Sequence, residues 1–141
     1  MFTSKGSLNR SFGIKFCIFV IYGCFLIALS ALKTAELFLP YIYQLESVLG
    51  GDKLMHLKLS AALSFLALLV FVPKWGSVWG LKVVIRCLLV CLLLIIGLSL
   101  DELHQAFTST RRFEFMDLAH GIAGICIGLV AYWLFVLASR V

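Results

Sequence analysis

Three pairs of a carboxylate and a histidine stand out in this sequence because the members of each pair are only a few residues apart. They are Asp52 with His56, Asp101 with His104, and Asp117 with His120. A histidine held by a carboxylate can take up or release a proton near neutral pH. General acid or base chemistry is therefore one prediction, with His56, Asp101 and His104 as candidate catalytic residues.

Basic and polar residues around these pairs indicate a second kind of chemistry, the binding of an anionic ligand. The candidate binding residues are Asp52, Lys53, Gln105, Arg111, Arg112, Asp117 and His120. Arginine can form two parallel hydrogen bonds to a phosphate or carboxylate, so Arg111 could hold such a ligand, with Arg112 as an extra cation. The alternative is that Arg111 pairs with an acidic residue of the chain itself.

The carboxylates also allow a structural interpretation. Asp52 and Asp117 open predicted helices, where a side-chain oxygen can accept hydrogen bonds from free backbone N–H groups. Asp101 ends a predicted helix, where the helix dipole disfavours an anion, so it needs a compensating cation, proton or basic side chain. In this alternative, the polar residues form a network that holds the helices together.

Three histidines and three aspartates could in principle ligate a divalent metal ion. Their spacing matches no standard metal motif, and we predict no metal site. The sequence has no glycine-rich phosphate loop after a strand and no nucleophile elbow, so it predicts no cofactor either.

Four long apolar segments must position these polar residues. They cover residues 14–32, 54–72, 81–100 and 118–138, and a helix of about 20 residues can cross a bilayer. The composition, 62% hydrophobic and 13% charged, is typical of an integral membrane protein. We predict an all-α polytopic membrane protein, in which residues 1–141 form one domain of four transmembrane helices in a compact bundle. The five cysteines lie in these segments, where we expect small buried side chains.

Basic residues flank the segments unequally. More of them lie beside the two termini and the middle loop than beside the other loops, and the positive-inside rule then predicts that both termini are cytoplasmic. The three carboxylate–histidine pairs would then share the opposite, extracytoplasmic face. The net charge of +5 arises from these flanking residues, so it indicates topology and not nucleic-acid binding.

Short sequence signals predict how the elements begin and end. After Pro40 we expect a short interfacial helix that ends at Gly50 and Gly51, with Asp52 as the N-cap of the next helix. Lys58 lies two turns inside that helix, and we expect it to reach back to the lipid headgroups.

Helical spacing predicts which side chains share a face. One polar face is turned inward on the second long helix, and it comprises Asp52, Lys53, His56, Ser60 and Ser64. If the third helix continues past Leu100, a second polar face forms, while Glu102 points elsewhere; that face comprises Asp101, His104 and Gln105. Gly124 and Gly128 on the fourth helix predict close approach of another helix.

The order and spacing of several of these residues resemble those of the VanZ-like membrane proteins. The matching residues are Asp52, Lys53, His56, Asp101, Glu102, Gln105, Arg111, Asp117, Gly124 and Gly128. The resemblance covers about residues 50–130. It implies a small bacterial protein of several spans, in a family associated with resistance to the glycopeptide teicoplanin and with envelope polysaccharide genes. The chain departs from the family pattern at Ser109 and Thr110, in place of Pro-Gly, and at Gly121, in place of Asn.

These observations lead to three hypotheses for a multi-pass protein of the bacterial cytoplasmic membrane. In the first, the extracytoplasmic polar residues recognise an anionic or glycan-bearing envelope lipid or precursor. In the second, the protein is a membrane-embedded enzyme that uses an aspartate–histidine pair on a lipid-linked substrate. In the third, it is an assembly subunit that binds a partner membrane protein through the face of Gly124 and Gly128.

Overall fold

A computed structural model describes residues 4–72, 80–109, 111 and 113–139. Over these residues the chain forms five α-helices and no strand. The helices are α1 (Ser4–Thr34), α2 (Leu39–Leu49), α3 (Asp52–Phe71), α4 (Leu81–Ala106) and α5 (Phe115–Ala138). The all-α prediction is therefore confirmed. The short helix expected after Pro40 is α2, which begins one residue before that proline.

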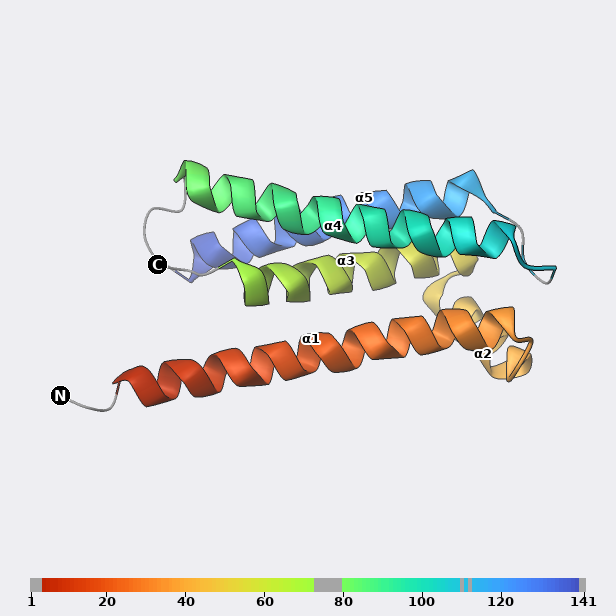
Figure 1. Ribbon diagram of the computed structural model, residues 1–141, viewed down its shortest axis with the longest axis horizontal. Helices are drawn as coiled ribbons and strands as arrows, with labels where there is room; N and C mark the ends of the chain where they lie inside the picture. The colour runs from red at the N-terminus through yellow and green to blue at the C-terminus, as the bar shows by residue number, and fades with distance from the viewer. Residues whose placement is uncertain (1–3, 73–79, 110, 112, 140–141) are drawn as a thin grey trace.

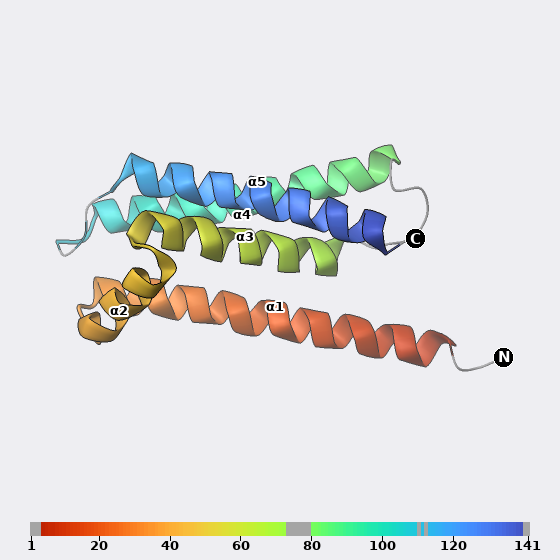
Figure 2. The ribbon, with the colours of Figure 1, turned by 180° about the vertical axis from the view of Figure 1, so that it is seen from behind.

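Four of the helices lie side by side along one axis, while α2 is short and lies at one end (Figures 1 and 2). These four contain apolar stretches long enough to cross a membrane, at Ser11–Thr34, Asp52–Phe71, Leu81–Ala106 and Phe115–Ala138. They coincide with the four predicted segments. The third long helix, α4, continues past Leu100 to Ala106, as the inward placement of Asp101 and Gln105 required.

The closest helix packing is between α3 and α5, and two glycines allow it. A Cβ atom at Gly124 would collide with the backbone oxygen of Leu57, and one at Gly128 would collide with that of Ala61. Ser64 adds a hydrogen bond from its hydroxyl to the Ile125 carbonyl at 3.0 Å. The predicted close approach is therefore made by α3 of the same chain, so this glycine face is already occupied and is not free for a partner protein.

A buried apolar cluster lies toward the opposite end of the bundle from α2. It comprises Leu68, Val72, Cys87, Tyr132 and Val136. The Tyr132 hydroxyl donates to the Val72 carbonyl at 3.1 Å, which satisfies a backbone group at the end of α3. Among the cysteines, Cys87 and Cys91 are buried as expected, whereas the expectation was wrong for Cys17, Cys24 and Cys126, which are exposed on the apolar surface.

The boundaries of α2 explain how the chain reverses before α3. Gly50 has φ +96°, and the Gly51 N–H bonds to the Glu46 carbonyl at 2.7 Å, which is the pattern of a glycine-terminated helix. This confirms the predicted end of the short helix. The predicted N-cap was wrong: Gly51 occupies that position, and Asp52 is the first helical residue and forms no capping hydrogen bond, because its carboxylate binds a lysine instead.

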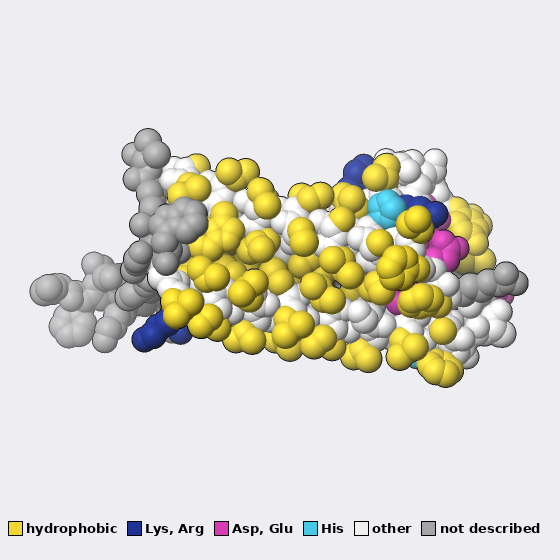
Figure 3. Space-filling model, turned by 90° about the horizontal axis from the view of Figure 1, so that it is seen from above, with side chains coloured by type: hydrophobic (Ala, Val, Ile, Leu, Met, Phe, Trp, Pro, Cys, Tyr) yellow, Lys and Arg dark blue, Asp and Glu magenta, His cyan; other side chains and the backbone are white. Residues whose placement is uncertain are grey.

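The helix α1 is more loosely attached than the other long helices. It packs against α3 and α2 but not along α4 or α5, and no residue of its apolar stretch is buried. Apolar side chains also cover the middle of the face seen in Figure 3, while charged side chains lie toward its ends. An exposed apolar surface of this extent is suited to contact with lipid.

Candidate functional site

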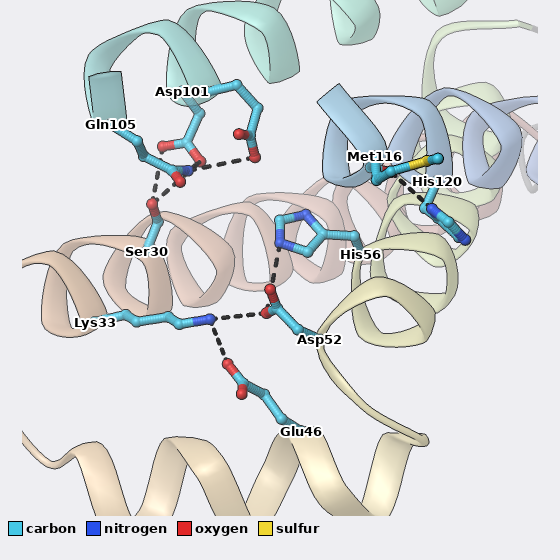
Figure 4. Close-up of polar contacts among 10 residues, drawn as sticks. Ser30, Lys33, Glu46, Asp52, His56, Asp101, Gln105, Met116 and His120 are labelled. Carbon is cyan, nitrogen blue, oxygen red and sulfur yellow. Dashed lines mark hydrogen bonds and ion pairs between the residues drawn. The ribbon is translucent and has the colours of Figure 1, made fainter. Parts of the chain in front are cut away.

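Polar side chains converge at one end of the bundle, where α1 and α4 end and α3 and α5 begin. We call this region, together with α2, the polar end. Figure 4 shows two groups of residues there, one centred on Asp52 and the other on Asp101. They originate from helices that are distant in sequence, so the fold and not local spacing brings them together.

The first group is organised by Lys33, which lies near the end of α1. Its ammonium nitrogen is 2.5 Å from Glu46 Oε1 and 2.7 Å from Asp52 Oδ1. The Lys33 side chain is only 16% exposed, and that of Glu46 is 12% exposed, so this is a partly desolvated charge network. It ties α1, α2 and α3 together, and it carries one positive charge for two carboxylates.

His56 and Asp117 adjoin the same aspartate. His56 Nε2 lies 3.8 Å from Asp52 Oδ1, which is beyond hydrogen-bonding distance. One potential ligand atom from each of Asp52, His56 and Asp117 lies within 4.8 Å of the other two. Asp117 is 4% exposed, and its Oδ1 has no hydrogen-bond partner. The first and third carboxylate–histidine regions of the sequence therefore meet directly through these residues.

The second group surrounds Asp101 near the end of α4. The Ser30 hydroxyl lies 2.9 Å from Asp101 Oδ1 and 3.1 Å from Oδ2, and Gln105 Nε2 donates to Oδ2 at 3.0 Å. We expected a cation, a proton or a basic side chain to compensate Asp101, and the side chains that donate hydrogen bonds to it among the described residues are both neutral.

Glu102 corrects a sequence prediction. It does not point away from the bundle: its side chain is fully buried, with Oε1 3.4 Å from Gln105 Nε2 and Oε2 without a hydrogen-bond partner. Conversely, His104 is exposed, although it was expected to share the inward face of Asp101 and Gln105. Both differences have one cause, which is the orientation of α4 about its own axis: Glu102 faces into the bundle and His104 faces outward.

A pocket of about 260 Å³ lies between the two groups, bounded mainly by α1, α3 and α4, with Ile125 of α5 also in its lining. Its polar lining is at the polar end and comprises Ser30, Lys33, His56, Ser60, Asp101 and Arg111. Its remaining walls are apolar and include Leu26, Ile27, Leu59, Leu63, Leu93 and Leu94. A pocket that is polar at one end and apolar elsewhere matches an amphiphilic ligand.

Arg111 is the cation of this lining that forms no close ion pair with a described carboxylate, although it interacts electrostatically with the buried Glu102. Among the described residues no acidic oxygen lies within ion-pairing distance of it, whereas Lys33 is engaged by two carboxylates. Arg111 thus has hydrogen-bond donors available to an anion in the pocket.

Among the predicted site residues that the structure describes, only His56, Asp101 and Arg111 line the pocket. Asp52 and Asp117 lie beside His56, and Gln105 lies beside Asp101, but none of these three is part of the pocket lining. Three further predicted residues lie elsewhere. Lys53 and His104 are exposed and do not line the pocket. His120 lies apart from both groups in Figure 4, with Nδ1 2.6 Å from the Met116 carbonyl oxygen of its own helix.

Arg112 lies outside the described residues. Lys58, which was expected to reach toward headgroups, bonds to the Leu49 carbonyl at 2.8 Å.

Sequence reasoning missed Ser30, Lys33 and Glu46. A usable signal was present for the first two, because Ser30 and Lys33 are three residues apart at the end of an apolar segment and therefore share a helical face. No comparable signal identified Glu46, because its partner depends on the path of the chain between α1 and α2.

Comparison of the chain with protein-family models, with curated proteins and with solved structures found no match. The function is therefore argued from the site itself.

Proposed function

We propose that this chain is a VanZ-like integral membrane protein of the bacterial cytoplasmic membrane that binds an anionic or glycan-bearing envelope lipid, or a lipid-linked precursor, at its polar end. The observation that carries the proposal is the pocket itself. It combines apolar walls from three long helices with Arg111, Lys33 and His56 at one end. A lipid has the same division between an apolar chain and a polar headgroup.

Membrane insertion is supported by four long apolar helices with apolar surfaces. Within a bilayer these surfaces would contact acyl chains and need no protein cover. The unequal distribution of basic residues favours cytoplasmic termini and an extracytoplasmic polar end. The spacing shared with VanZ-like proteins supports the same compartment. A fluorescent protein fused at the C-terminus should then fold and fluoresce in the cytoplasm, and a dark but stably produced fusion would contradict this topology.

The position of the pocket supports entry of the ligand from the side. Ile27 of α1 and Leu93 of α4 line the pocket, yet they are 72% and 67% exposed. The pocket therefore reaches the apolar surface between these two helices. Leu93 precedes Asp101 by eight residues, which is about 12 Å along a helix. In a bilayer this opening would face the hydrocarbon region, where an acyl or polyprenyl chain could enter.

The polar lining supports a headgroup that combines a phosphate with hydroxyl groups. Arg111 can donate two parallel hydrogen bonds to a phosphate, whereas the charge of Lys33 is already compensated by Glu46 and Asp52. Asp101 accepts hydrogen bonds on both oxygens and can accept another from a hydroxyl group. The volume of about 260 Å³ is below the roughly 300–1,000 Å³ of pockets for drug-sized ligands. It therefore suits a headgroup with part of one chain, while the rest of the lipid stays in the bilayer.

The proposal can be tested with lipids of defined charge. The purified protein, in detergent supplemented with phosphatidylglycerol, phosphatidylcholine or a polyprenyl phosphate, would be examined by native mass spectrometry for retained lipid. We expect preferential retention of the two anionic lipids. Loss of a charge-assisted contact of about 1.5–3 kcal/mol in Arg111→Ala should weaken this retention by about tenfold to more than a hundredfold.

Arg86→Ala is the matched control, because Arg86 is an exposed arginine on α4 outside the pocket. It should retain lipid as the wild type does. Leu93→Trp should reduce retention of every lipid by filling the opening. Equal retention of anionic and zwitterionic lipids by the wild type, or unchanged selectivity in Arg111→Ala, would overturn the proposal. Stronger retention of the polyprenyl phosphate than of phosphatidylglycerol would identify a lipid-linked precursor as the ligand.

His56 gives a specific reason to keep the enzyme as a second candidate. It lines the pocket and adjoins two carboxylates, so it could act as an acid or base on a bound lipid-linked substrate. Turnover of a labelled lipid-linked sugar that disappears in His56→Ala but persists in His104→Ala would establish this activity. Binding without turnover by the wild type would leave recognition as the function.

A further inference from the structure

We infer that Asp52, His56 and Asp117 form a binding site for a divalent transition-metal ion. One ligand atom from each residue lies within 4.8 Å of the other two. Asp52 and His56 are one turn apart on α3, and Asp117 is in the first turn of α5. The tight α3–α5 contact at Gly124 and Gly128 holds these two helices in a fixed relation, so the site is built on rigid elements.

The second observation is the state of Asp117. This aspartate is 4% exposed, and its Oδ1 is buried without a hydrogen-bond partner. No described lysine, arginine or histidine nitrogen lies within 4.0 Å of it. A buried carboxylate oxygen without a hydrogen-bond partner is unfavourable, and the adjacent Asp52 carboxylate adds repulsion between like charges. An ion beside Asp52 and His56 would supply both the missing charge and the missing contact.

The surrounding charges also favour a cation. Lys33 reaches Asp52 but is shared with Glu46, so these three groups together remain negative. Glu102 adds a further buried carboxylate at the same end of the bundle, and Arg111 offsets part of its charge. The local excess of negative charge is therefore not removed by the lysine, and it would strengthen binding of a doubly charged ion.

The ligand types indicate the class of metal. Two carboxylates with one imidazole suit zinc or manganese better than magnesium or calcium, which prefer oxygen ligands alone. Ligands at about 2.1 Å around a tetrahedral ion are about 3.4 Å apart. The three side chains would thus need to close by little more than about 1 Å. Water or a group of the pocket ligand would complete the coordination, since His56 also lines the pocket.

Metal binding can be measured without any lipid ligand, so its failure is distinguishable from failure of the proposed function. The chelator-treated full chain in detergent would be titrated with Zn²⁺, Mn²⁺ and Mg²⁺ by calorimetry, and bound metal would be counted by elemental analysis. We expect about one zinc or manganese ion per chain. Cobalt substitution should give a visible absorption spectrum that reports coordination directly.

Asp117→Asn and His56→Gln should each reduce affinity at least about tenfold, and both should abolish the cobalt spectrum. His104→Gln is the matched control, because His104 is exposed and lies outside the site. Helical content and elution volume would confirm that each variant is folded. Absence of stoichiometric binding by the wild type, or wild-type affinity in both site variants, would overturn the inference and leave a proton as the compensating species at Asp117.

Discussion

The hydroxyl of Ser30 on α1 is hydrogen-bonded to the carboxylate of Asp101 on α4, at 2.9 Å from Oδ1 and 3.1 Å from Oδ2. Both residues line the pocket, and their contact joins two helices that do not otherwise pack along their lengths. It also brings a donor to a carboxylate near the end of its helix, where the dipole is unfavourable to an anion.

Loss of this contact should destabilise the protein measurably. We expect Ser30→Ala to lower the free energy of unfolding by about 0.6–1.7 kcal/mol, the range of polar contacts between membrane helices. Thermal unfolding in detergent, followed by circular dichroism, would measure the change. Ser99→Ala is the control, because the Ser99 hydroxyl bonds to Ile95 within its own helix. An equal effect in both variants would show that the contact between helices contributes nothing specific.

The glycines between α3 and α5 should tolerate no added methyl group. In Gly124→Ala the new Cβ would overlap the Leu57 backbone oxygen, which cannot rotate away, so the helices must separate. We expect a loss of about 1–3 kcal/mol in unfolding free energy. Gly97→Ala has nothing within 4 Å of the new atom, and alanine's helix propensity should leave stability unchanged or raised by up to about 1 kcal/mol. Similar stabilities for the two variants would contradict the tight packing.

Removal of the Lys33 ammonium should leave two carboxylates close together without a cation. We expect Lys33→Met to reduce stability by about 1–3 kcal/mol, less than for a fully buried pair because Asp52 remains 35% exposed. Lys53→Met is the control at the same end of the bundle, since Lys53 is exposed and outside the network.

The charge explanation for Lys33 can be separated from a loss of packing. Adding Glu46→Gln and Asp52→Asn to Lys33→Met should recover part of the lost stability, because the uncompensated negative charges are then removed. Unfolding midpoints of the single and triple variants at equal salt would be compared. If the triple variant were no more stable than Lys33→Met, the lysine would act mainly through its aliphatic stem.

The helices could be predicted from the sequence because their signals are local. Long apolar runs identified the four long helices, and Pro40 with Gly50 identified the short one. The close helix packing at Gly124 and Gly128 could also be predicted, because small residues at this spacing allow another helix to approach closely. The residue against which each glycine packs was not encoded locally.

The candidate site was less predictable because its contacts depend on helix rotation and loop path. The orientation of α4 about its axis determines that Glu102 is buried while His104 is exposed, and the sequence does not specify this orientation. Lys33 and Glu46 meet only because α2 folds back beside the end of α1. The predicted N-cap at Asp52 failed for a related reason: a lysine distant in sequence offered its carboxylate a stronger partner than a backbone N–H group.

The loose attachment of α1 makes it the wall of the pocket with the fewest contacts to hold it in place. Its links to the rest of the bundle include individual polar bonds, from Tyr22 to the Leu59 carbonyl, from Ser30 to Asp101 and from Lys33 to Asp52. The wall formed by α3 is held more firmly, because α3 packs directly against Gly124 and Gly128 of α5. If the pocket binds a lipid as proposed, a headgroup too wide for it would displace α1 at the expense of these bonds, while α3 and α5 would stay together.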